Sequence, residues 1–218
     1  MKNRSTSRAA RWLGASLLAV AAITGHSLAV SAAESQSVNF DGATFVNKGL
    51  VAVGRVPSDA KDKLGDTLGG FGSGMVADVN SWKKDGDTYT GTFYMLPDRG
   101  WNTECSVDYP GRLQKFSVEF TPYGGADIVP QTQLKLHYED SIVLHEANGT
   151  PTTGLDASEV RKAANGFPDM PSANGKIGLG GEGVVLMPDG SFWVSDEYGP
   201  YVDHFTDGGR LVGAIRPP

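Results

Sequence analysis

Cysteine is almost missing from this sequence of 218 residues, since Cys105 is the only one. An intrachain disulfide is therefore excluded. A lone cysteine in an exported protein indicates a buried thiol, a bridge to another chain, or a pair with a cysteine in sequence not present here. A nucleophilic role is disfavoured because no base is marked beside Cys105. The role of this residue stays open.

Several common catalytic motifs are also missing. No Gly-x-Ser-x-Gly elbow occurs, so a Ser-His-Asp triad of the α/β-hydrolase kind is not expected, although Ser195 is a weak candidate nucleophile. The glycine-rich stretch 67–74 lacks the Gly-Lys-Ser/Thr ending of a phosphate-binding loop. Neither His145 nor His204 is spaced with other ligands as a zinc site requires, which favours surface or packing roles for both.

Positive charge is scarce beyond the N-terminus. The whole chain carries 19 basic and 25 acidic residues, a net charge of −6. Four of the basic residues and none of the acidic ones precede position 34, which leaves 15 against 25, or −10. This balance argues against nucleic acid as a partner and favours cation binding.

Only one long apolar run is present, and it lies at the N-terminus. A basic region precedes the apolar segment Trp12–Ile23, and Ser31–Ala33 offers the small-x-small pattern of a signal peptidase site. A transmembrane anchor is the alternative, but the run is shorter than the roughly 20 residues required. We therefore predict that residues 1–33 form a Sec-type signal peptide, that the mature chain is secreted or periplasmic, and that it leaves the membrane after cleavage.

The last forty or so residues predict a compact β unit. Pro188-Asp189-Gly190 is a turn, since proline presets φ and glycine accepts positive φ. Four short strands are expected around it and after it, at 183–187, 191–194, 201–205 and 210–215. Four antiparallel strands of this size are typical of one β-propeller blade.

An internal repeat extends this pattern upstream. Three segments recur in the same order: 72–76 as 181–185, 91–94 as 190–193, and Asp98 with Gly111-Arg112-Leu113 as Asp196 with Gly209-Arg210-Leu211. These matches indicate two copies of one four-stranded unit. Units of this size stack on one another, so we predict an all-β, propeller-like fold.

The stretch between the two copies contains a segment without a regular strand pattern. Strands are predicted over 38–56, 89–96 and 133–145, whereas 146–171 is irregular. Within it, 156–164 is the one helix candidate, with Asp156 as cap and Glu159 completing a capping box. Its length favours a functional connection or a lid over a plain linker.

Three stretches of the sequence resemble a known family. LPDRGWN at 96–102, GLVAVGRVPSD at 49–59 and EGVVLMPDGSFWVSDEYGPYVDHF at 182–205 are similar to the family named for the esterase-like activity of phytase. The resemblance runs from about Val38 to the last residue. It implies a secreted or periplasmic β-propeller that hydrolyses phosphoric or carboxylic esters. Family members are longer, so residues 34–218 are expected to form an incomplete ring, the N-terminal portion of a longer chain.

The candidate active site consists of acidic residues at strand ends. Glu182 precedes an inner strand, whereas Asp98, Asp196 and Glu197 follow second strands. Because loops at one face of a propeller converge on its channel, these carboxylates are expected to gather into a Ca²⁺ site, with Glu182, Asp196 and Asp98 as ligands. Asp98, Arg99, Glu197 and Tyr198 are the candidate catalytic residues, with Arg99 gripping an anionic group of a small ester or phosphoester substrate.

Other interpretations of the same residues stay open. Acidic residues at β-turns are often solvated turn formers, Asp98 and Arg99 can form a structural ion pair, and Tyr198 can fill space between blades. At the level of function, a non-catalytic propeller that binds a ligand, or a calcium-dependent lactonase, is the alternative to an ester hydrolase. The sequence leaves the substrate, the metal, the number of blades and the oligomeric state open.

Overall fold

A computed structural model describes residues 36–98, 108–124 and 133–218. The predicted signal peptide, Arg99 and Cys105 lie outside these ranges. Every regular element within them is a β-strand, which confirms the predicted all-β class. None of the described segments forms a helix that is long and apolar enough to cross a membrane.

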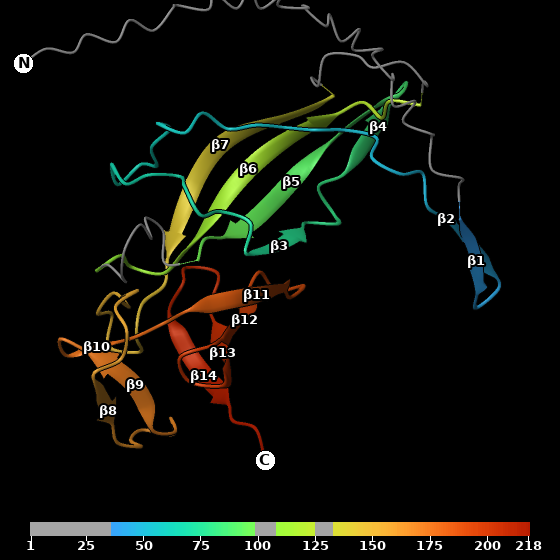
Figure 1. Cartoon of the computed structure of the whole chain (residues 1–218). Helices are drawn as coiled ribbons and strands as arrows, with labels where there is room; N and C mark the ends of the chain where they lie inside the picture. Colours follow the sequence, from blue (N-terminus) through green and yellow to red (C-terminus); the bar gives the residue numbers. More distant parts are fainter. Residues whose placement is uncertain (1–35, 99–107, 125–132) are drawn as a thin grey trace, which may run out of the picture. The chain divides into compact units, whose positions relative to one another are not determined.

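Two antiparallel sheets of similar build dominate the fold (Figure 1). The first has the order β3-β5-β6-β7, with the short β4 paired to the start of β5. Its strands are β3 (Gly74–Ala77), β4 (Lys83–Asp85), β5 (Thr88–Leu96), β6 (Arg112–Phe120) and β7 (Leu134–Val143). The second follows the chain in order: β11 (Gly181–Leu186), β12 (Phe192–Asp196), β13 (Tyr201–Phe205) and β14 (Leu211–Ile215). The four strands predicted in the last segment are thus confirmed.

Two smaller sheets complete the described chain. A hairpin pairs β1 (Ser37–Phe40) with β2 (Ala43–Val46). The third sheet has the order β10-β9-β8, with β8 (Glu159–Arg161), β9 (Met170–Ala173) and β10 (Lys176–Ile177). It lies within the long connection between the two main sheets. The described residues do not close a ring.

The internal repeat is confirmed as two four-stranded units, but one of its three matches was wrong. Gly111-Arg112-Leu113 leads into β6, the third strand of the path β3-β5-β6-β7, whereas Gly209-Arg210-Leu211 leads into β14, the last strand of the second sheet. The two segments are therefore not equivalent in the fold. A short Gly-Arg-Leu sequence marks the entry to a strand, and it does not say which strand follows.

The helix predicted over 156–164 was also wrong. Residues 159–161 form β8 and pair with β9, and the chain then reverses at a tight turn in which Asn165 and Gly166 have φ of 54° and 85°. Local helix preference is weak, and strand pairing with a sequence-distant partner overrides it. Asp156, the predicted cap, instead accepts a hydrogen bond from the hydroxyl of Tyr198 at 2.9 Å.

The main core lies between the two large sheets. It is formed by buried apolar side chains of both sheets and of the long connection, including Leu96, Leu113, Leu144, Met170, Leu179, Phe192, Val194 and Phe205. The edge strands β3 and β11 lie side by side. A Cβ atom at Gly74 would lie 3.1 Å from the carbonyl oxygen of Glu182, so the glycine permits this close approach. This contact brings the predicted acidic residues of the two sheets together.

A second core covers the other face of the first sheet. Leu68, Met95 and Phe116 are buried there, with Val56 and Phe71 packed against them. The segment that supplies Leu68 is held by Arg112, whose guanidinium donates to Asp62 and, at 2.9 Å, to Asp66. This buried ion pair fixes the segment that leads into β3.

Candidate functional site

Asp98 directly follows the second strand of the first sheet. β5 ends at Leu96, Pro97 stops the ladder because it has no N–H to donate, and Asp98 comes next. The backbone N–H of Asp98 donates to the carbonyl oxygen of Gly70 at 3.2 Å, so the glycine-rich segment anchors it. The Asp98 side chain is half-buried.

Glu182 lies at a β-bulge in the first strand of the second sheet. Gly181 pairs with Asp196 and Gly183 pairs with Ser195, so Glu182 is the extra residue of β11. A bulge re-aims the side chain that it carries, and bulges are frequent next to active sites. The hydroxyl of Ser73, the residue directly before β3, donates to Glu182 Oε2 at 2.8 Å and orients the carboxylate.

Asp196 is buried and organises the turn that follows β12. Its Oδ1 accepts from the N–H of Gly180 at 2.9 Å and of Tyr198 at 3.0 Å, and its Oδ2 accepts from the N–H of Gly199 at 3.2 Å. Burial raises the pKa of Asp196 to about 6, although the three N–H donors pull it down. A carboxylate with this many backbone donors is built to shape a turn.

The turn held by Asp196 presents Glu197 to solvent. The N–H of Glu197 donates to the carbonyl oxygen of Gly180 at 2.9 Å. A Cβ atom at Gly180 would lie 2.7 Å from Cγ of Glu197, so the glutamate side chain runs directly over this glycine. Asp196, the last residue of β12, is buried, whereas Glu197, the first residue of the turn, is exposed.

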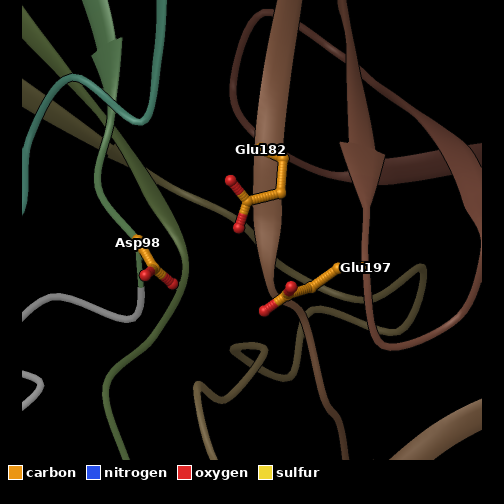
Figure 2. Close-up of side chains that lie close together, drawn as sticks. All are labelled: Asp98, Glu182 and Glu197. Atoms are coloured by element: carbon orange, nitrogen blue, oxygen red, sulfur yellow. The ribbon is translucent and has the colours of Figure 1, made fainter.

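The structure brings three of the predicted carboxylates together. Asp98, Glu182 and Glu197 each offer a carboxylate oxygen, and these oxygens all lie within 4.8 Å of one another. Figure 2 shows the three side chains directed toward a common space from two different sheets. Two ligands of one Ca²⁺ ion, each at about 2.3–2.6 Å, lie at most about 5 Å apart. The donor set and its spacing therefore fit a hard divalent cation.

Two other predicted site residues, Asp196 and Tyr198, lie outside this cluster. Asp196 is not part of the cluster, because its oxygens face the backbone donors of its own turn. Tyr198 donates from its hydroxyl to Asp156 and, at 3.1 Å, to the carbonyl oxygen of Gly154, so it joins the turn to the long connection. Arg99 lies outside the described residues. Ser73 was not predicted, because only the fold places it beside a glutamate 109 positions away.

His204 has a packing role, which is one of the two roles that the sequence favours for it. Its ring stacks on Trp193 with centroids 4.2 Å apart and planes at 7°. Its Nε2 lies 3.0 Å from the hydroxyl oxygen of Ser191, which in turn donates to Asp189 at 2.6 Å. The serine hydroxyl thus points to an aspartate, whereas a catalytic triad places the histidine between the two.

Comparison with known proteins identifies the family of this chain. Residues 67–218 match the family described as esterase-like activity of phytase. The chain belongs to this family. The resemblance is thereby confirmed for the motifs at 96–102 and 182–205, whereas the motif at 49–59 precedes the matched residues. All of the clustered carboxylates lie within the matched region.

One relative in this phytase-like family is an uncharacterized secreted protein of Arthroderma benhamiae. It is 45% identical over 194 residues, which cover 80% of this chain and 38% of the relative. The chain thus spans less than half the length of that protein. No solved structure matches the chain.

Proposed function

We propose that this phytase-like chain belongs to an exported hydrolase of phosphoric or carboxylic esters in which Asp98, Glu182 and Glu197 hold a divalent cation, Ca²⁺ by preference. The observation that carries the proposal is the convergence of three carboxylate oxygens from two sheets within 4.8 Å. Family membership supports the reaction class, and the secreted relative supports an extracellular location, with residues 1–33 as the signal peptide.

Some residues of the proposed site bind the cation or the substrate, and others position those residues. When bound, the cation would polarise an ester or phosphoryl oxygen and acidify a water. Ser73 orients Glu182 through its hydrogen bond, and Asp196 positions Glu197 through the turn that it organises. Arg99, next to Asp98 in the sequence, is proposed to grip an anionic group of the substrate with its planar guanidinium.

The architecture of the proposed enzyme is a propeller. Two sequential four-stranded sheets with a shared core and adjacent edge strands are the repeating element of that fold. We propose that further units complete the ring in the longer family proteins. Ca²⁺ takes six to eight oxygen ligands, so water, substrate and other units would supply those beyond the three described.

The test is turnover of chromogenic esters. With Ca²⁺ present, we expect hydrolysis of p-nitrophenyl phosphate or p-nitrophenyl acetate, and Glu197→Gln should lower kcat/KM about 100-fold, equivalent to about 3 kcal/mol of transition-state stabilisation. Glu159→Gln, an exposed glutamate of β8, is the matched control and should retain full activity. Equal turnover by Glu197→Gln would contradict the proposed centre, and cation binding without turnover would make the chain a binding module.

A further inference from the structure

A cleft of about 520 Å³ lies between the two large sheets. Residues 76–77 and 184–186, the last residues of β3 and β11, form its walls. Apolar side chains from the core line it as well, among them Leu113 and Phe192, which are 0% and 1% exposed. Glu182, in contrast, is the second residue of β11. The cleft and the acidic cluster therefore lie toward opposite ends of the paired strands β3 and β11, and they share no residue.

The lining of this cleft carries two negative charges and no positive one. Asp78 follows β3, Asp207 lies in the turn between β13 and β14, and none of the lining residues is lysine, arginine or histidine. Asp78 Oδ1 accepts the backbone N–H of Asn80 at 3.0 Å, a bond that leaves the charge in place. Asp207 Cβ lies 3.4 Å from the position of a Cβ atom at Gly190, so its side chain lies against the turn between β11 and β12. An apolar cleft with carboxylates at its rim complements a molecule with an apolar body and a cationic head.

Basic side chains near the cleft lie outside its lining. Lys115 is opposite Asp140 in the register of β6 and β7, so its positive charge faces a carboxylate. Arg210 follows Asp207 by three positions, but the two form none of the ion pairs in the described part of the chain. The carboxylates of Asp78 and Asp207 are therefore the charges closest to an occupant, and their sign favours a cation.

We propose that this cleft is a binding site for a small organic cation, an ammonium group on a short aliphatic chain. The chain lies against Leu113, Ile142 and Leu186, and the ammonium group lies at the rim beside the carboxylates of Asp78 and Asp207. Pockets for small ligands span about 300–1,000 Å³, so the volume suits a chain of several carbons. An anion of the same length would meet only negative charge at the rim, which gives the cleft its selectivity.

Methionine methyl NMR tests this site directly, because Met187 lines the cleft and Met75 does not. Both side chains are exposed, so the Met75 methyl reports general adsorption to the surface. The two signals are assigned with Met187→Leu and Met75→Leu, and hexylammonium chloride is titrated at neutral pH. We expect the Met187 methyl to shift and to saturate at millimolar hexylammonium, as the small size of the ligand predicts, and the Met75 methyl to stay in place.

Hexanol and hexanoate test the preference for positive charge. Hexanol should bind about fivefold more weakly than hexylammonium, and hexanoate more weakly still. In the double variant Asp78→Asn/Asp207→Asn, the affinity for hexylammonium should fall to that for hexanol. Hexanol itself should bind to this variant as before, which also shows that the cleft is intact.

A second double variant, Asp85→Asn/Asp87→Asn, is the matched control. It removes two exposed carboxylates that do not line the cleft, so it should keep the full preference for hexylammonium. An unmoved Met187 signal, equal affinities of the original chain for hexylammonium and hexanol, or an undiminished preference in Asp78→Asn/Asp207→Asn would overturn the proposal.

Discussion

Replacing Arg112 by glutamine should lower the free energy of unfolding by about 3–5 kcal/mol, the usual cost of breaking a buried ion pair. The side chains of Arg112 and Asp62 are both 0% exposed, so the substitution would leave a buried carboxylate without its countercharge. The guanidinium carbon also lies 3.8 Å from the ring centroid of Tyr109, and that stacking would be lost. The covering segment that contains Asp62 and leads toward β3 should loosen first.

Urea denaturation checks this expectation, with Lys135→Gln as the exposed ion-pair control that should change stability by about 1 kcal/mol or less. Burial alone would raise the pKa of Asp62, but the hydrogen bond from Arg112 and those from backbone N–H groups hold it below its ordinary value. The contribution of the Asp62 carboxylate to stability is therefore present above its unfolded pKa and is lost as pH falls through its folded pKa. If Arg112→Gln lowers the free energy of unfolding by less than about 1 kcal/mol, the folded state does not require Arg112 as the countercharge of Asp62.

Replacing Asp203 by asparagine should stabilise the fold at pH 8 by about 1–3 kcal/mol. Asp203 is 1% exposed, and within the described structure its Oδ1 has no hydrogen-bond partner. Burial, and next the negative charge of Asp196, raise the pKa of Asp203 to about 7. The ionised form is the one that the folded chain tolerates poorly, and asparagine removes that charge while keeping the shape.

The sign of the pH dependence follows from the raised pKa of Asp203. Its folded value of about 7 exceeds the unfolded value of 3.8, so the contribution of Asp203 to stability is fully present below the unfolded pKa. It declines as pH rises from about 4 to about 7, and the loss is complete above that. Urea midpoints at pH 4.5 and pH 8 should therefore differ less in Asp203→Asn than in the original chain. An identical pH dependence in both would contradict the account, and Asp207→Asn, an exposed control, should change neither midpoint.

The β-rich last segment could be predicted from the sequence because its determinants are local. The strand predicted at 201–205 matches β13 at both ends, and Pro188-Asp189-Gly190 forms the turn between β11 and β12. The third sheet could not be predicted, because β8 exists only through its pairing with β9. Nor could the ion pair of Arg112 and Asp62, whose partners are 50 positions apart.

The acidic cluster was predictable in part. Three of its candidates converge as expected, since they lie at strand ends of two adjacent sheets. Asp196 is buried and accepts hydrogen bonds from the backbone of its own turn, whereas its neighbour Glu197 is exposed, and the sequence alone did not distinguish these two environments. The bulge at Glu182 could not be predicted from the sequence either, because it appears only in the register of β11 against β12.

The central claim, that Asp98, Glu182 and Glu197 hold a divalent cation, is tested most directly by thermal melting with and without excess CaCl₂. A ligand at about 100 times its Kd stabilises by about 2.7 kcal/mol, which raises the Tm of a chain of this size by several degrees. We expect that rise in the original chain and in Glu159→Gln, and its loss in a Glu182→Gln/Glu197→Gln double variant. A Tm that does not respond to Ca²⁺, or one that rises equally in the double variant, would contradict the account.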